Sequence, residues 1–448
     1  MIDHFPSCLG EWRTFPGWQR PTAMDTIPDP AQISQAQATV KPGLHVPSIW
    51  QLGLTLIAIL AVWSMALSAA VLGLVQRFSP AAADSDPLPF LLMSAGLLLV
   101  GILLAPSAGY ALRRLMGRSI ATSISMRGLV IPAFVVALLP LALLAGNWIS
   151  SRQEFAWLLL PPFHILAIGL PVLFLTYLAI HGLSLGSPQR AWGVFAAGSF
   201  LGPVLIFAAE IVVLIAVLAI GILWLSSQPG LMNNLATQME RLQSGSLSPE
   251  QAQQLILPYL TRPAVIFTIG IFGAVIVPLI EELLKPIGVW FLVGTPLTPA
   301  GGFIAGILCG AGYALIESLG LASSGEEWAS LAVARMGTAG VHIFTTGLSG
   351  WALSLAWRQN RYLRLGGVYL FNVFFHGLWN ALTLTIVVYS LSRLGNTVSI
   401  YNRLENIARI APIMLGGLAL FSIIGLLVAN WYLSKTREQE TPYDSNVV

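Results

Sequence analysis

Four glutamates and three histidines lie within strongly apolar segments of this 448-residue sequence, where lipid rather than water must surround them. These residues are Glu210, Glu281, Glu282, Glu317, His164, His342 and His376. An ionisable group at the centre of a bilayer costs about 3 kcal/mol, so such groups are rare and indicate functional sites by default. Three of the four acids and two of the three histidines fall between residues 281 and 376. We therefore expect a polar site in this part of the chain.

Two adjacent carboxylates, Glu281 and Glu282, stand between Pro278 and Pro286 in an otherwise apolar segment. Each proline removes a backbone hydrogen bond and can open a helix to water at depth. Lys285 follows at helical spacing, so it can pair with either carboxylate. Adjacent carboxylates resist double ionisation while the lysine favours it, and a carboxylate balanced in this way suits a general base that deprotonates water. A charge cluster at a helix end, with the lysine reaching the interface, would explain the same residues without catalysis.

The other three residues of this region have polar neighbours at helical spacing. They are Tyr313 before Glu317, Thr345 and Thr346 after His342, and Asn380 after His376. Each of these residues alone could be structural. Two imidazoles that converge with carboxylates can orient water, bind a metal ion or hold an oxyanion.

Several other hydrolase signatures are missing or weak. Two cysteines cannot form a four-thiolate metal site, and the absence of an H-E-x-x-H helix excludes a zincin-type site. No aspartate lies between Asp86 and Asp444, which argues against an aspartyl intramembrane protease. Ser349, within Gly347-Leu348-Ser349-Gly350, could form a dyad with His376. Small residues in a membrane helix more often form packing surfaces, and the dyad leaves the glutamates unexplained.

The succession of motifs resembles the PrsW family of intramembrane proteases and, more distantly, the superfamily of CAAX-prenyl proteases and bacteriocin-processing enzymes. The resemblance covers roughly residues 265–391. Its four blocks are Glu281-Glu282-x-x-Lys285, Tyr313-Ala314-x-x-Glu317, His342 followed by Thr345 and Thr346, and His376-Gly377-x-Trp379-Asn380. Tyr313 and Ser318 depart from the family, which more often has Phe and Asn there.

This resemblance implies cleavage of a membrane-anchored protein or peptide, such as an anti-sigma factor, with Glu281, Glu282 and one histidine essential. Glu317, His342 and His376 would complete the polar site, supported by Lys285, Tyr313 and Asn380. Two chemistries stay open. In one, Glu281 or Glu282 activates water while His376 and Asn380 stabilise the oxyanion. In the other, zinc is held by His342, His376 and either Glu317 or one glutamate of the pair, which leaves one glutamate as base.

The elements that must position these residues are membrane helices. Hydrophobic residues make up 56% of the chain and charged residues only 9%, against about 25% charged in a soluble domain. The net charge of +3 is too small to indicate nucleic-acid binding. Apolar runs predict an all-α, polytopic membrane protein with about ten spans. The predicted spans cover residues 49–75, 89–110, 128–149, 155–180, 192–225, 264–293, 301–321, 336–357, 367–391 and 410–433.

Basic loops predict the orientation of these spans in the cell membrane. Arg113, Arg114, Arg118 and Arg127 share one loop, and Arg358, Arg361 and Arg364 share another. By the positive-inside rule both chain termini are cytoplasmic. We divide the chain into a disordered tail (1–47), a five-helix membrane region of unknown role (48–225), an amphipathic hairpin (226–262), a five-helix PrsW-like region (263–433) and a polar tail (434–448).

Two local interpretations and two other functions follow from the same sequence. Ser248 and Gln251 form a capping-box pattern that opens the second helix of the hairpin. Glu210 and His164 are interpreted as a structural pair between helices. Five plus five spans could instead form an ion- or proton-coupled transporter with Glu281, Glu282 and Lys285 as a relay, although the first half shows no matching broken segment. A scaffold or receptor is the third possibility.

Overall fold

The computed structural model describes residues 45–79, 86–121, 123–126, 128–243, 248–260, 262–320, 325, 327–394 and 398–440. The chain divides into two units, residues 1–45 and 46–448, and the description below concerns the second. Most of the predicted tail 1–47 and the last eight residues of the predicted tail 434–448 lie outside the described residues, whereas residues 434–440 continue the last helix.

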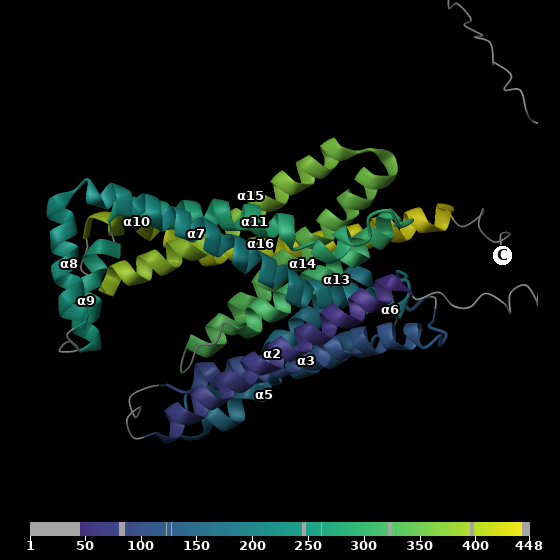
Figure 1. The fold of residues 1–448 in the computed structure, drawn as a ribbon, viewed down its shortest axis with the longest axis horizontal. Helices are drawn as coiled ribbons and strands as arrows, with labels where there is room; N and C mark the ends of the chain where they lie inside the picture. Colours follow the sequence, from purple (N-terminus) through teal and green to yellow (C-terminus); the bar gives the residue numbers. More distant parts are fainter. Residues whose placement is uncertain are drawn as a thin grey trace, which may run out of the picture. The chain divides into compact units, whose positions relative to one another are not determined.

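Helices make up nearly all of the described part (Figure 1), and nine of them are long and apolar enough to cross a membrane. These nine are α2 (Val46–Phe78), α3 (Leu88–Leu115), α4 (Val130–Ser150), α5 (Gln153–Ile180), the broken helix α6 to α7 (Pro188–Ser226), the broken helix α10 to α12 (Pro263–Trp290), α13 (Pro299–Gly320), α15 (Tyr362–Leu394) and α16 (Val398–Glu440). The structure confirms the predicted all-α, polytopic membrane fold.

The tenth predicted span is α14 (Glu327–Gln359), which is long but not apolar enough to count among the nine. The helix begins nine residues before the predicted start at residue 336. The prediction was late because the first turns contain the charged residues Glu327 and Arg335, which do not continue the apolar run. α14 packs against α5, α13, α15 and α16, so protein rather than lipid surrounds most of its polar side chains. A central helix of this kind escapes a hydropathy criterion that measures compatibility with lipid.

Small residues allow the backbones of α13 and α14 to approach closely. A Cβ atom added to Gly306 would lie 2.2 Å from the Thr346 carbonyl oxygen, and one added to Gly350 would lie 2.2 Å from the Gly302 oxygen. Small residues at such crossings permit van der Waals packing and weak hydrogen bonds between helices. The segment around Ser349 is thus a packing surface, as its small residues predict.

We expect Gly306→Val to destabilise the protein, because its side chain has no room between α13 and α14. Overpacking of this kind costs about 1–3 kcal/mol, which thermal unfolding of the detergent-solubilised protein would register as a lower midpoint. Gly416→Val in α16 is the matched control, since an added Cβ there meets nothing within 4 Å. Equal effects of the two substitutions would contradict the close approach of the two helices.

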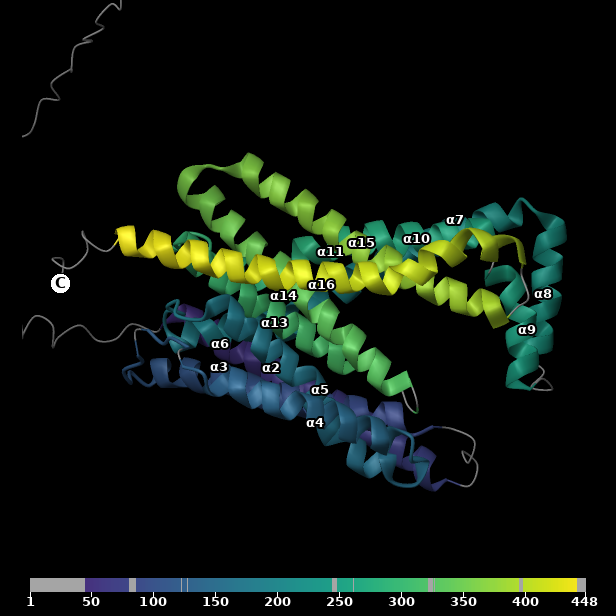
Figure 2. The ribbon, with the colours of Figure 1, turned by 180° about the vertical axis from the view of Figure 1, so that it is seen from behind.

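The N-terminal helices support the central pair from one side. α3 and α5 pack against α13, and α5 also packs against α14 (Figures 1 and 2). Trp328 of α14 donates a hydrogen bond to His164 Nδ1 in α5 at 3.3 Å. The predicted pair of His164 with Glu210 is therefore wrong, because His164 bonds to Trp328 instead.

Two spans are broken by five-residue π-helical segments that directly precede a proline-containing helix. In the fifth span, η2 (Ala197–Leu201) separates α6 (Pro188–Ala196) from α7 (Gly202–Ser226). In the sixth, η3 (Phe272–Ile276) separates α10 (Pro263–Ile271) from α11 (Val277–Leu284). The break before Pro278 agrees with the opening that the prolines predict. The expectation that the first half contains no broken segment is wrong, because η2 interrupts the fifth span. π-Helical turns occur frequently at functional sites.

The hydrophilic connection between these broken spans forms two helices, α8 (Pro229–Gln243) and α9 (Pro249–Leu260). The Ser248 backbone donates to Gln251 Oε1 at 2.9 Å and the Gln251 backbone donates to Ser248 Oγ at 3.3 Å, which confirms the capping box. α7 and α10 extend past the end of α13 to reach α8 and α9 (Figures 1 and 2).

Candidate active site

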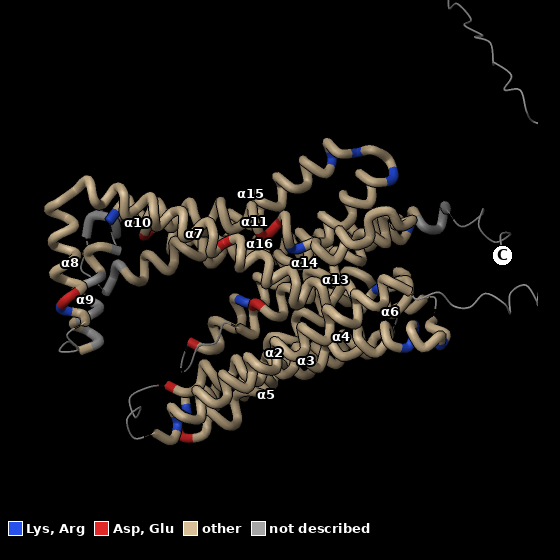
Figure 3. Tube along the Cα trace, viewed as in Figure 1, with Lys and Arg blue, Asp and Glu red and all other residues tan. Residues whose placement is uncertain are grey.

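The two adjacent glutamates lie inside the bundle on α11, next to a lysine that is completely buried. Glu281, Glu282 and Lys285 are 6%, 2% and 0% exposed. The Lys285 ammonium lies 2.8 Å from Glu281 Oε2 and 2.9 Å from Glu282 Oε1. Figure 3 shows acidic residues at α11, away from both ends of the helices. A buried charge requires a partner of opposite sign, so this ion-pair group is not a solvated helix end.

Both histidines of the region converge on the same ammonium group. His342 of α14 and His376 of α15 are buried, and their Nδ1 atoms lie 2.8 Å and 3.3 Å from Lys285 Nζ. The His376 ring also lies between the two carboxylates, with Nδ1 3.0 Å from Glu282 Oε1 and Nε2 3.9 Å from Glu281 Oε2. The two imidazole rings meet edge to face at 5.1 Å.

Glu317, from α13, reaches the cluster on its other side. Its Oε2 atom lies 2.6 Å from His342 Nε2 and 3.0 Å from an Arg335 guanidinium nitrogen. Arg335 also donates to Ser318 Oγ at 3.2 Å. The structure therefore brings Glu281, Glu282, Glu317, His342 and His376 into one cluster. The Glu317 side chain is 30% exposed, so the cluster is most accessible at this carboxylate.

The predicted supporting residues occupy different places around the cluster. Tyr313 packs edge to face on the His342 ring at 5.1 Å, and Lys285 Nζ lies 4.9 Å from the Tyr313 ring centre. Asn380 was predicted to stabilise an oxyanion, but in the structure its amide donates a hydrogen bond to the Gly273 carbonyl oxygen in η3 at 2.9 Å. Asn380 thus supports the π-helical segment of the glutamate-bearing span. Ser349 accepts a hydrogen bond from Asn372 at 2.9 Å, which places its hydroxyl in a different network from that of His376.

Two charged residues near the cluster were not predicted as site residues. Arg335 lies one residue outside the predicted span, and only its pairing with Glu317 shows why a buried guanidinium is tolerated there. Glu210 lies on α7, which packs against the glutamate-bearing helix α11. Its Oε1 atom is buried without a hydrogen-bond partner among the described residues. Its apolar helical context was the only sequence signal for a role near the site.

A comparison with protein families finds one family model that matches the region containing this cluster. Residues 209–401, less than half of the chain, match the model of a family described as PrsW family intramembrane metalloprotease. This region is similar to the PrsW family of proteases. It is accordingly an intramembrane protease, a peptide hydrolase, within an integral multi-pass membrane protein. No curated protein and no solved structure matches the chain. The more distant relation to CAAX-prenyl proteases stays a prediction.

The PrsW-family match begins in α7, immediately before Glu210, and so extends further toward the N-terminus than the predicted region 263–433. It includes the α8 and α9 hairpin and all five clustered residues. Helices α2 to α5 lie outside it.

The side chains of the PrsW-family cluster fit a metal ion. Glu281, His342 and His376 can each offer one ligand atom, and these atoms lie within 4.8 Å of one another. Two imidazoles and a carboxylate are a common zinc donor set that leaves a position for water. Each imidazole also has a carboxylate beside one of its nitrogens, Glu317 for His342 and Glu282 for His376, as metal-bound histidines usually do. Of the predicted carboxylate ligands, Glu281 of the pair, rather than Glu317, belongs to this group.

We expect Arg335→Gln to lower kcat, by less than the about 10- to 100-fold that is usual when the group orienting a metal ligand is itself removed. Arg335 holds Glu317, which in turn contacts His342. Cleavage kinetics and zinc affinity should both weaken, whereas Arg335→Lys keeps the charge and should recover part of each. An Arg335→Gln protein with unchanged zinc affinity and kcat would show that the guanidinium serves stability alone.

Proposed function

We propose that Glu281, Glu282, Glu317, His342 and His376 form the active site that hydrolyses a peptide bond of a membrane-anchored protein. The observation that carries this proposal is the convergence of α11, α14 and α15 on one buried ammonium group, with Glu317 of α13 in contact with His342. Charged groups inside an apolar bundle are costly, so they are rare and indicate a functional site by default. A transporter relay of Glu281, Glu282 and Lys285 would not account for the contact between Glu317 and His342.

In this proposal each residue has a distinct task. Glu281, His342 and His376 would hold a zinc ion, which when bound activates water and polarises the scissile carbonyl group. Glu282 acts as the general base, because its Oε2 atom has no hydrogen-bond partner in the described part while Oε1 is held near Lys285 and His376. Glu282 takes the proton from the attacking water and later delivers it to the leaving amine. Glu317 orients His342.

The glutamate-only chemistry uses the same base with Lys285 as the positive group of the site. The observation that favours it is that the ammonium contacts Glu281 Oε2 and His342 Nδ1, two groups that a zinc ion would also use. Ion and ammonium therefore compete for the same side chains. Metal removal separates these two versions.

The substrate we propose is a protein with a membrane anchor, such as an anti-sigma factor, and the support for it is the family resemblance. We also propose that both termini are cytoplasmic. The end of the bundle near α6 carries basic residues with hardly any acidic ones, whereas both signs occur at the other end (Figure 3). This asymmetry follows the positive-inside rule.

The proposed substrate class can be tested by comparing new protein N-termini in membranes that contain either the wild-type protein or Glu281→Gln/Glu282→Gln. We expect new termini within or beside the anchors of single-span proteins, only with the wild type. Immunoblotting must show equal amounts of both proteins. Identical N-termini in the two samples would contradict peptide hydrolysis at this cluster.

A further inference from the structure

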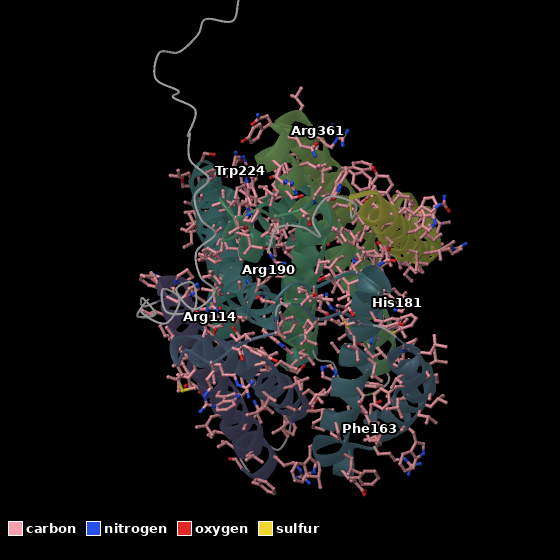
Figure 4. All side chains as sticks on the ribbon, turned by 90° about the vertical axis from the view of Figure 1, so that its right-hand side faces the viewer. Arg114, Phe163, His181, Arg190, Trp224 and Arg361 are labelled. Carbon is pink, nitrogen blue, oxygen red and sulfur yellow. The ribbon has the colours of Figure 1, made fainter. Side chains whose placement is uncertain are left out.

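A basic cavity of about 540 Å³ lies at the end of the bundle near α6, apart from the glutamate and histidine cluster. Its walls come from the turn before α6, the start of α13, the end of α14 and the last turns of α16. Arg190, Arg361 and Arg364 line it together. Figure 4 looks onto this end of the bundle and labels Arg190 and Arg361. The volume is typical of a site for a small ligand, about 300–1,000 Å³.

Among the side chains that the structure describes, no acid neutralises the positive charge of this basic cavity. None of the residues that line it is acidic, and none of its arginines has a carboxylate partner among these side chains. The connections 111–129, 181–191, 291–300 and 358–366, which lie at this end, contain no Asp or Glu, so the acids nearest in sequence to the cavity wall are Glu438 and Glu440, which follow Thr436 in α16. Three guanidiniums without carboxylates favour an anion from outside the chain.

The geometry of the arginines indicates a phosphate group. Arg190 comes from α6, whereas Arg361 directly precedes α15 and Arg364 lies in the first turn of α15, so the donors come from different segments. Arg364 stacks over the Trp351 ring at 5.6 Å, which limits the positions of its guanidinium. Planar guanidinium groups bind phosphate through paired hydrogen bonds, and preorientation reduces the entropy lost on binding.

The surroundings indicate that the phosphate belongs to a lipid. Tyr432 lies in the last turn or so of the membrane span within α16, where aromatic side chains meet the headgroup layer. Arg190 also lines a second, mainly apolar cavity of about 580 Å³, whose walls include Leu54, Phe200 and Phe291. One arginine thus borders both a basic cavity for a headgroup and an apolar cavity for hydrocarbon. Basic pockets between cytoplasmic helix ends bind anionic headgroups in other membrane proteins.

We infer that the basic cavity is a binding site for the phosphate of an anionic phospholipid, held by Arg190, Arg361 and Arg364. Such a ligand would join α6, α13, α14 and α16 at one end of the bundle. α13 and α14 carry Glu317 and His342, so lipid binding would stabilise two helices of the cluster. A free phosphate ester has the same chemistry, and the experiment below distinguishes the two sources.

The full-length protein can be placed in nanodiscs of phosphatidylcholine with or without phosphatidylglycerol. We expect phosphatidylglycerol to raise the thermal midpoint of the wild type and to remain bound in mass spectra after transfer to detergent. Arg361→Gln/Arg364→Gln should retain about tenfold less phosphatidylglycerol or lower still, since a hydrogen bond to a charged group contributes roughly that factor. Arg190→Gln should act in the same direction.

The matched control is Arg113→Gln/Arg114→Gln, which removes two exposed charges at the same end without touching the basic cavity. It should retain phosphatidylglycerol like the wild type. Equal losses in both double variants, or no preference of the wild type for phosphatidylglycerol, would overturn the site, and the second result requires no variant. Glycerol 3-phosphate and inorganic phosphate are added separately in phosphatidylcholine discs. If either stabilises the wild type as strongly as the lipid, the ligand is a soluble phosphate, and if neither does, it is the lipid.

Discussion

Replacing Glu282 by glutamine should lower peptide cleavage at least about 100-fold, the smaller end of the range for a lost general base. The amide has nearly the same shape as the carboxylate but cannot accept the proton of the attacking water. Lys285 keeps its second carboxylate partner, Glu281, at 2.8 Å, so its buried charge is still paired. We therefore expect the loss to appear in kcat, with little change in unfolding temperature.

The informative comparison is with Glu281→Gln and Ser349→Ala, measured with one membrane-anchored substrate. Glu281→Gln should lower both zinc content and cleavage, because Glu281 belongs to the group that could hold a metal ion. Glu282→Gln should lower cleavage and retain the metal. Ser349→Ala should remain active, since its hydroxyl bonds to Asn372. Activity that survives without Glu282 and disappears without Ser349 would point to a serine nucleophile instead.

The sequence was sufficient to predict most of the cluster because burial of charge in lipid is visible in one dimension. A glutamate or histidine within an apolar run must have a partner, whatever the details of packing. Glu281, Glu282, Glu317, His342 and His376 could all be selected on this basis, and the structure brings them together. The capping box at Ser248 was equally predictable, since it depends only on residues three apart.

Glu210 shows why the remaining part of the site could not be predicted. A helical period assigns the face of a residue only while the helix remains regular. The π-helical segment η2 lies between α6 and α7 and contains a wider turn, which changes the rotational phase of every later residue. Glu210 follows this segment, so the face of α7 on which it lies depends on a break that the sequence pattern does not reveal.

Glu281 and Glu317 can belong to one cluster only if the spans that carry them are offset from each other along the membrane normal. Both residues lie late in oppositely directed spans, so equal placement in the membrane would separate them. α7 and α10 instead extend well past the end of α13 (Figure 1). Hydropathy gives each span's length but not its offset, which is set by packing between helices. Arg335 was missed for a related reason, because a charge paired inside the protein resembles a span boundary in the sequence.

Metal removal should have the second large effect. Treatment of the purified protein with 1,10-phenanthroline is expected to abolish cleavage, and added zinc should restore it, if Glu281, His342 and His376 hold the ion. Elemental analysis should find about one zinc per chain in the wild type and much less in His342→Ala. Glu317→Gln should weaken zinc binding about 10- to 100-fold, because it removes only the group that orients His342.

Two controls separate loss of the ion from other effects of the chelator. The non-chelating isomer 1,7-phenanthroline should leave cleavage unchanged, and the chelated protein should keep its helical circular dichroism. Full activity of a zinc-free protein would contradict the metal version and leave Glu282 as the base. Lys285 would then be the positive group of the site, since its ammonium lies within 3.3 Å of both carboxylates and both imidazoles. The same contacts that make Lys285 a competitor of zinc would in that case hold the reacting groups together.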